Sequence, residues 1–441
     1  MSARARYALG MRALVLSALC AVLLSACVAP ETGASNTAAS APAAGSGASG
    51  TTQEAAPSAA AASTPVNTGP KKIVGYFTNW AQYRKGCKFT AADVDASLLT
   101  NINYAFAKVD PGPGGKEHPK FGLAPLEAND LGPKGQYAQI NALKKKYPGL
   151  KTSLSVGGWG HNEKADMWWL FTTMAEKPES RAEWIKASIA YVRQNDFDGL
   201  DIDWEYPADP TRGGRSIDTN NFTALLTELR SAINAEAKSS GKDALLLTIA
   251  APAGVVVRGL DLPKIWQPLD WINLMSYDYN GGWEPHTNHN APAPKVGMGV
   301  QGSVSIYMNF GVPADKIVLG MATYGRDYAD AEGSAVGSMS KGNAPPGRCT
   351  GAAGILAYFE VKELLDSGKL KPAWDDAAQV PYAYGSSSKL WVSYDDPRSF
   401  EKKMDFIDQK GLGGAMFWAL DMDDYQHGYP LISAVAKRYK K

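Results

Sequence analysis

Acidic side chains recur at every second position of one short, otherwise apolar segment, DGLDIDWEYP at 198–207. Asp201, Asp203 and Glu205 alternate there with large apolar residues. Residues two apart share one face of a β-strand, so the carboxylates would line one side while the apolar residues pack on the other. This pattern predicts a buried strand that carries carboxylates into a central cavity, where they could perform acid–base chemistry.

The spacing of the three carboxylates also suggests how they divide the chemistry. Alternate residues lie roughly 6.6 Å apart along a strand, so Asp203 can reach both neighbours, whereas Asp201 and Glu205 are too far apart to touch directly. Like charges in a poorly hydrated site raise at least one pKa. We expect Asp201 and Asp203 to share a proton, and Glu205 to be protonated often enough to donate one to a leaving-group oxygen.

Two other interpretations of the acidic segment remain open. Closely spaced acids also occur in calcium-binding loops, but those loops need polar, turning residues and a central glycine between the acids.

The five histidines show no spacing typical of metal ligands, and we expect them on the surface or in loops. They are His118, His161, His286, His289 and His427. We therefore expect no metal and no cofactor. The second alternative is a buried structural network without catalysis.

The acidic segment is one of eight short apolar runs, which are separated by amphipathic segments. Such runs are typical of strands buried on both faces. They span 72–78, 101–109, 151–158, 199–205, 245–252, 271–278, 316–325 and 413–421. Helical periodicity falls between several of them, for example at 181–195 and 221–238. Alternating strands and helices predict a parallel sheet, and eight such units predict an α/β fold with a closed (β/α)8 barrel, the TIM barrel.

The last gap between these runs is too long for one helix. Residues 326–392 are therefore expected to form a small inserted α+β subdomain between the seventh and eighth strands. Its helix would lie in LAYFEVKELLDS and one of its strands in LWVSYD. Catalytic groups of such barrels lie at the carboxyl ends of the strands, and Glu205, followed by Tyr-Pro, is in that position.

The first 70 residues differ in composition from the rest. Residues 1–26 place three arginines ahead of the run ALVLSALCAVLLSA, a layout typical of a signal peptide. The run ends in LSAC, which resembles a bacterial lipobox and implies cleavage before Cys27 and lipid attachment to it; an ordinary secretory signal is the alternative. Residues 27–70 are mostly Ala, Ser, Thr, Gly and Pro and predict a disordered tether. The folded domain would then span 71–441.

The charge balance gives no reason to expect an anionic partner. Taking the three arginines of residues 1–26 from the 45 basic residues leaves 42 against 44 acidic ones, a net charge of about −2. We therefore expect a neutral substrate, no nucleic acid, and membrane contact only through the N-terminal lipid. Val28 after the lipobox suggests the outer membrane by the same resemblance. We therefore expect the mature protein to be an exported monomer. It would be a lipoprotein of the outer membrane or cell surface, or otherwise a secreted protein.

Two cysteines remain in the expected folded domain, Cys87 and Cys349. In an exported chain they could pair across the fold. Two separate thiols are the alternative, and the sequence leaves both open.

Taken together, the motifs resemble those of glycoside hydrolase family 18, the chitinases and their relatives. DGLDIDWE matches the family signature DxxDxDxE, and SLSVGG at 153–158 matches its SxGG motif. MSYD at 275–278, YGR at 324–326 and MFWALDMDD at 416–424 match motifs of the later strands. FTNWAQYR and GILAYFEV also resemble chitinase segments. The resemblance runs from about Lys71 to the C-terminus, with the motifs in order.

This resemblance implies a retaining hydrolysis in which the substrate supplies the nucleophile, outside the usual two-carboxylate scheme. The 2-acetamido oxygen of the sugar would attack the anomeric carbon and form an oxazolinium ion. Glu205 would protonate the glycosidic oxygen and then activate water. Asp203 would bind the acetamido N–H, Asp201 would hold the proton that lets Asp203 change partners, and Tyr277 would donate its hydroxyl to the acetamido oxygen. The implied substrates are chitin and chito-oligosaccharides, polymers of β-1,4-linked N-acetylglucosamine.

The resemblance also implies a set of substrate-binding residues and three cis peptides. Trp418 would form the floor of the site, Tyr76 and Phe106 its bottom, and Met275 its side wall. Trp80, Trp159 and Trp283 would be stacking platforms for sugar rings. Asp278, Tyr324 and Arg326 would make polar contacts, and Glu360 would belong to the wall formed by the insertion. The cis peptides would be Ala105–Phe106, Glu205–Tyr206 and Trp418–Ala419.

Two further functions remain open within this resemblance. A lectin of the same fold would bind chitin oligomers without cleaving them, but such lectins usually replace the glutamate that stands here at 205. An endo-β-N-acetylglucosaminidase acting on glycoproteins would share the carboxylate strand but typically lacks the insertion and the aromatic groove. Glu205 and the insertion therefore favour a chitinase.

Overall fold

The computed structural model describes residues 69–162, 167–293 and 299–440. The expected signal sequence, Cys27 and all but the last two residues of the expected tether lie outside these ranges. Within them, no helix is both long enough and apolar enough to span a bilayer.

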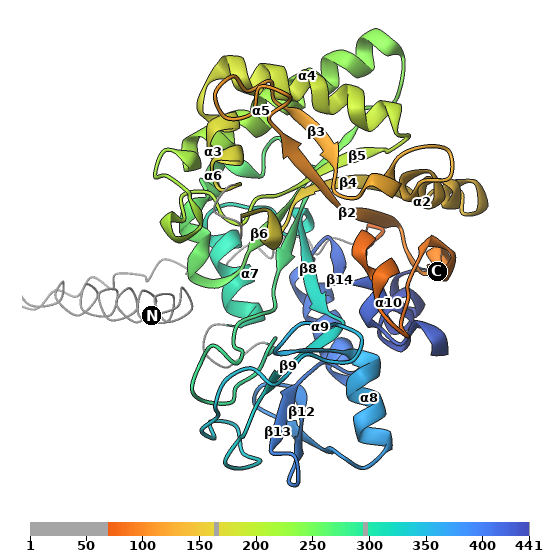
Figure 1. Ribbon diagram of the computed structural model, residues 1–441, viewed down its shortest axis with the longest axis vertical. Coiled ribbons are helices and arrows are strands. Elements are labelled where there is room, and N and C mark those ends of the chain that lie inside the picture. The colour runs from red at the N-terminus through yellow and green to blue at the C-terminus, as the bar shows by residue number, and fades with distance from the viewer. Residues whose placement is uncertain (1–68, 163–166, 294–298, 441) are drawn as a thin grey trace, which may run out of the picture. The chain divides into compact units, whose positions relative to one another are not determined.

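Eight parallel strands form a closed barrel (Figure 1). They are β1 (Lys72–Thr78), β2 (Asn101–Asp110), β4 (Lys151–Gly157), β5 (Gly199–Asp203), β6 (Leu246–Pro252), β7 (Trp271–Met275), β8 (Ile317–Ala322) and β14 (Gly414–Trp418). The first strand, β1, pairs in parallel with both β2 and β14, which closes the ring. Each strand falls in one of the eight predicted runs, except that β2 ends one residue beyond its run, so the predicted (β/α)8 barrel is confirmed. A short strand, β3 (Gly122–Pro125), adds an antiparallel extension to β2 that the sequence did not indicate.

Helices follow most of the barrel strands. They are α2 (Gln136–Lys146), α3 (Trp169–Glu176), α4 (Pro178–Gln194), α5 (Asp218–Ser240), α6 (Leu262–Ile265), α7 (Val300–Asn309), α9 (Pro397–Lys410) and α10 (Pro430–Tyr439). The longest, α5, shows why they form. Leu225, Leu229 and Ile233 recur every four residues, so they share one helix face, and all are buried in one core with the β5 side chains. The helix ends at Gly241, whose φ of 69° is the left-handed conformation that glycine adopts at low cost.

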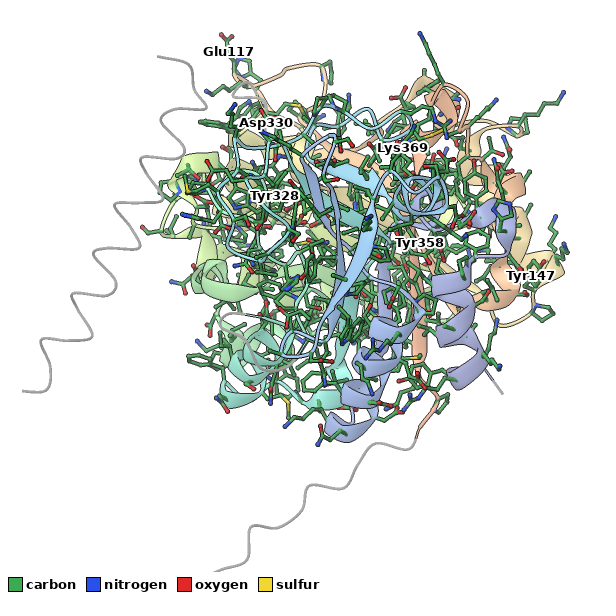
Figure 2. All side chains as sticks on the ribbon, turned by 90° about the horizontal axis from the view of Figure 1, so that it is seen from below. Glu117, Tyr147, Tyr328, Asp330, Tyr358 and Lys369 are labelled. Carbon is green, nitrogen blue, oxygen red and sulfur yellow. A yellow bond between two sulfur atoms is a disulfide. The ribbon has the colours of Figure 1, made fainter. Side chains whose placement is uncertain are left out.

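The predicted insertion is present as an antiparallel sheet with one helix. It consists of β9 (Tyr324–Tyr328), β10 (Ile355–Ala357), α8 (Tyr358–Asp366), β11 (Lys371–Asp375), β12 (Val380–Gly385) and β13 (Leu390–Ser393), in the strand order β10-β9-β13-β12-β11. Figure 1 shows this subdomain at the lower end of the barrel, and Figure 2 looks onto it from below, with Tyr328, Asp330, Tyr358 and Lys369 marking it.

The boundaries of the insertion differ from the prediction in two places. The subdomain sheet begins at Tyr324, before the expected boundary at 326. The helix expected in LAYFEVKELLDS begins only at Tyr358, because Leu356 and Ala357 pair with Gly325 and Tyr324 as part of a sheet. The segment is apolar enough for either state, and the neighbouring strand decides between them.

A disulfide joins Cys87, in the loop after β1, to Cys349 in the insertion, with their Cα atoms 5.6 Å apart. Both cysteines are buried. The backbone N–H of Cys349 also donates to Glu360 Oε1 at 2.7 Å. Of the two alternatives that the sequence left open, the structure therefore shows the paired one, a covalent link between the barrel and its insertion.

Candidate active site

The three alternating carboxylates of the acidic segment enter the barrel as their spacing predicts. Asp201 and Asp203 lie on β5, and Glu205 follows just beyond the strand's end. All three are buried. Trp204, which alternates with them, packs outward and stacks on Phe171 of α3 with ring centroids 5.1 Å apart. The apolar side of the segment thus fixes the strand, and its acidic side faces the interior.

Asp201 is held by four donors from four different strands. Its Oδ2 accepts hydrogen bonds from the hydroxyls of Tyr76 (2.8 Å) and Ser155 (2.7 Å). Its Oδ1 accepts from the Thr248 hydroxyl (2.5 Å) and the Asn273 amide (3.1 Å). Burial raises the pKa of Asp201, and all four hydrogen bonds oppose that rise because they favour the carboxylate. Sequence reasoning named only Tyr76, although the other three stand out as polar residues inside apolar strand runs.

Asp203 differs from Asp201 in having an unpaired oxygen. Its Oδ1 is buried and has no hydrogen-bond partner among the described residues. Burial, together with the charges of Glu205 and Asp201, raises the pKa of Asp203 well above its usual range, while the charge of Arg212 opposes this rise. Buried acceptors are rarely left unpaired in folded proteins. The oxygen is therefore positioned to meet a donor from a bound molecule.

Glu205 has the proton affinity of a general acid and base that works near neutral pH. Burial raises its pKa to about 7, and the charge of Asp278 adds to this rise. A hydrogen bond from Tyr206 and the charge of Arg212 act in the opposite direction. A group with this pKa can both give and take a proton near neutrality.

Two glycines of the SLSVGG motif bring the loop after β4 close to the acidic segment. Gly157 has a φ of 116°, and a Cβ there would lie 2.2 Å from the carbonyl oxygen of Asp203. Gly158 has a φ of 84°, a Cβ there would collide with the Phe106 ring, and its N–H donates to the Asp203 carbonyl at 2.8 Å. Only glycine permits this approach, which explains both residues of the motif.

Aromatic rings gather around Trp418 at the end of β14. Trp418 stacks on Phe106 with centroids 5.8 Å apart and lies 5.5 Å from Tyr76 and 6.2 Å from Trp80. Met275 packs against the same cluster. Within this cluster, the buried hydroxyl of Tyr277 lies 3.8 Å from Met416 Sδ. The structure thus brings together the predicted floor, bottom and side wall.

Asp278 is the centre of a second, polar cluster. Its carboxylate accepts the Tyr324 hydroxyl at 2.6 Å and two guanidinium N–H groups of Arg326 at 2.7 and 2.6 Å. Arg326 in turn lies over the Trp283 ring, 5.1 Å from its centroid. The four predicted residues therefore form one connected unit, with Tyr324 and Arg326 supplied by the first strand of the insertion.

Two predicted stacking platforms are partly open to solvent. Trp159 is 44% exposed and Trp283 is 38% exposed, although large aromatic rings are usually buried. Each ring has a guanidinium over one face, Arg212 on Trp159 and Arg326 on Trp283. Sequence reasoning missed Arg212. Its position between Thr211 and two glycines, just after the acidic segment, was the available signal.

Glu360 takes a different place from the one expected for it. It is 4% exposed, and its two carboxylate oxygens accept backbone N–H groups from Cys349 (2.7 Å) and Ala357 (2.9 Å). Its bond to Ala357 satisfies the backbone N–H of the residue that precedes α8. The structure therefore makes Glu360 a residue that holds the insertion together, with one backbone N–H donated to each of its carboxylate oxygens.

The three expected cis peptides are present at Ala105–Phe106, Glu205–Tyr206 and Trp418–Ala419. Among the residues that the structure describes, no three His, Cys, Asp or Glu side chains are grouped so as to hold a metal ion. His289 is buried in a loop and its Nε2 lies 2.9 Å from Asp375 of the insertion.

Comparisons with known proteins agree with this geometry. The family model described as glycosyl hydrolases family 18 matches residues 72–423. Chitotriosidase-1 of Mus musculus is 39% identical over 380 residues, which cover 82% of this chain and 76% of that protein. The aligned part spans 92% of Chitinase-3-like protein 2 of Homo sapiens and 56% of Chitinase A1 of Niallia circulans.

Two solved structures are similar along their whole length. An immunomodulatory active chitinase from Trichuris suis has a TM-score of 0.75 at 33% identity, covering 84% of this chain and 100% of that one. Human YKL-39, described as a pseudo-chitinase with retained chitooligosaccharide binding properties, has a TM-score of 0.74 at 33% identity, again covering 84% and 100%.

Proposed function

Since this chain belongs to glycosyl hydrolase family 18, we propose that it is a chitinase that hydrolyses the β-1,4 bonds of N-acetylglucosamine polymers with retention at the anomeric carbon. One observation carries the proposal. The unpaired, buried Oδ1 of Asp203 stands beside a glutamate whose pKa is raised to about 7. This combination suits a substrate that brings its own amide N–H and needs a proton on its leaving group.

In the first step the substrate's acetamido oxygen attacks its own anomeric carbon while Glu205 protonates the glycosidic oxygen, so that the bond to the leaving sugar breaks. Asp203 accepts the acetamido N–H and stabilises the positive oxazolinium ring. The Tyr277 hydroxyl donates to the acetamido oxygen and fixes its direction. Holding the amide against the anomeric carbon supplies the gain of an intramolecular reaction.

In the second step Glu205, now ionised, takes a proton from a water molecule, and the water oxygen opens the ring at the anomeric carbon. Two successive displacements on that carbon restore its original configuration. Asp201, fixed by its four donors, holds the proton that lets Asp203 change partners between Asp201 and Glu205 during the two steps.

The aromatic floor and the polar cluster hold the sugars on either side of the reacting bond. Trp418 offers an apolar face to the C–H groups of one ring. Asp278, with Tyr324 and Arg326, offers a fixed set of polar atoms to the neighbouring sugar. The half-open rings of Trp159 and Trp283 continue this surface along the chain.

Product analysis tests the proposal. The domain from Lys71 onward is incubated with hexa-N-acetylchitohexaose and, separately, with a glycoprotein carrying N-linked glycans. A chitinase shortens the hexamer and leaves the glycoprotein intact; release of glycans instead would identify an endo-β-N-acetylglucosaminidase. Glu205→Gln should bind the hexamer without cleaving it. A wild-type protein that binds the hexamer and never cuts it would be a lectin, like the pseudo-chitinase relative.

We also propose that the chain is exported as a monomer and anchored by lipid on Cys27. The support is the sequence alone: three arginines, an apolar run and LSAC, followed by the Ala/Ser/Thr-rich residues to 70. Labelled palmitate should enter the wild-type protein in a bacterial host but not Cys27→Ser. Equal labelling of both, or none of either, would contradict the anchor.

A further inference from the structure

The loop after the acidic segment delivers Arg212 into the site in a fixed conformation. Arg212 ends a short 3-10 turn, η6 (Pro210–Arg212), whose N-terminus is capped by Asp209 through the Thr211 N–H at 2.9 Å. Gly213 follows with a φ of 80°, and a Cβ there would lie 2.4 Å from Trp168. The loop is therefore closely packed on both sides of Arg212, whose own side chain is buried.

The guanidinium of Arg212 contacts two parts of the site at once. Its Nε donates to the backbone carbonyl of Glu205 at 2.7 Å, and its Nη2 donates to the backbone carbonyl of Trp159 at 2.5 Å. Its plane lies over the Trp159 ring, with Cζ 3.6 Å from the ring centroid. A planar group with several donors can make these three contacts together, whereas a lysine ammonium cannot.

We propose that Arg212 is a positioning residue that couples the general acid to the Trp159 platform, holding the Glu205 peptide and the exposed ring in register for a bound sugar chain. The proposal rests on the proposed function and adds a residue that the family motifs do not include. Arg212 acts through its two neighbours rather than on the reacting atoms. Its loss should loosen the Glu205 carboxyl, which lowers kcat, and free the Trp159 ring, which raises KM.

The charge of Arg212 gives the proposal a second readout. Glu205 is faced by Asp203, Asp278, Tyr206 and Tyr277 as well as by Arg212. Of these, Arg212 is the cation, and its charge lowers the pKa of Glu205. Replacing it with a neutral residue should therefore move the alkaline limb of the pH profile upward. A merely structural defect would lower activity at all pH values without moving that limb.

The experiment compares Arg212→Lys and Arg212→Met with the matched pair Arg215→Lys and Arg215→Met. Arg215 lies three residues further on and bonds to Thr172 and Glu176, outside the site. On hexa-N-acetylchitohexaose, we expect Arg212→Lys to raise KM about five- to tenfold, as for freeing one large side chain, and to lower kcat with an unmoved alkaline limb. Arg212→Met should also raise KM and lower kcat, and in addition should move the alkaline limb to higher pH. The Arg215 variants should match wild type.

A double-mutant cycle with Trp159→Ala decides whether Arg212 acts through the ring. In that background Arg212→Lys should no longer raise KM, while its effect on kcat should persist. The proposal would be overturned by any of three results. These are an equal rise of KM in both backgrounds, wild-type kcat and KM for Arg212→Lys, and an alkaline limb that does not move in a folded Arg212→Met. The cycle is repeated as hexamer binding by calorimetry in Glu205→Gln. A wild-type protein that binds without turnover would refute the proposed function, whereas this binding cycle would still measure the coupling.

Discussion

Arg326 and Asp278 form a two-point ion pair, with Nε–Oδ1 and Nη2–Oδ2 distances of 2.7 and 2.6 Å. The pair joins the first strand of the insertion to the segment just after β7, and the Asp278 charge raises the pKa of Glu205. Asp278→Asn should therefore lower that pKa and move the alkaline limb of kcat/KM to lower pH, opposite in direction to Arg212→Met. Asp330→Asn, whose partner is the exposed Lys341, is the control. If the alkaline limb of kcat/KM did not move in Asp278→Asn, the Asp278 charge would not affect the pKa of Glu205.

The pH dependence of the wild-type reaction follows from the protonation of Glu205. The acid must carry a proton to donate it, and its pKa is about 7. We expect kcat/KM to fall tenfold per pH unit above about pH 7, because this parameter reports the free enzyme. Activity that continued to rise up to pH 9 would be inconsistent with Glu205 as the proton donor.

The same ionisation should destabilise the fold. A carboxyl whose pKa is higher in the native than in the unfolded state binds extra protons when folded, so stability is lost as pH rises from about 4.5 towards 7. Glu205→Gln removes this loss. We expect the variant to equal wild type at pH 4 and to exceed it at pH 8 by up to about 3 kcal/mol, measured by denaturant unfolding. A variant less stable than wild type at pH 8 would contradict the sign.

The Cys87–Cys349 disulfide should stabilise the domain by constraining the unfolded chain. It closes a loop across 262 residues and ties the insertion to the barrel. Replacing both cysteines with serine should cost about 2–4 kcal/mol, and reductant should lower the wild-type transition but not that of the variant. Equal transitions with and without reductant would mean that the link is absent in solution.

Sequence reasoning located the barrel and its carboxylates because both depend on local patterns. Each strand is a short apolar run, and the period of two in the acidic segment separates inward from outward residues. Contacts between distant segments were harder to predict. No pattern indicated that Ser155, Thr248 and Asn273 converge on Asp201 from three strands, since only the closed barrel brings them together.

The contacts of Glu360 and Arg212 could not be predicted from the sequence for a similar reason. Glu360 lies in a motif that suggested a groove wall, but backbone N–H groups of Cys349 and Ala357 occupy its oxygens. Arg212 belongs to no motif, and its importance appears only when its loop folds back onto Glu205 and Trp159. Which loops meet at the barrel mouth depends on tertiary packing.

The proposed reaction depends on attack by the substrate's own amide while Asp203 holds the N–H of that amide. The most direct measurement compares initial rates on hexa-N-acetylchitohexaose and on the fully deacetylated hexamer, with the anomer of the first product followed by NMR. We expect the acetylated hexamer to be cut to β-anomeric products and the deacetylated hexamer to remain intact. Cleavage of both hexamers at similar rates, or α-anomeric first products, would contradict the claim.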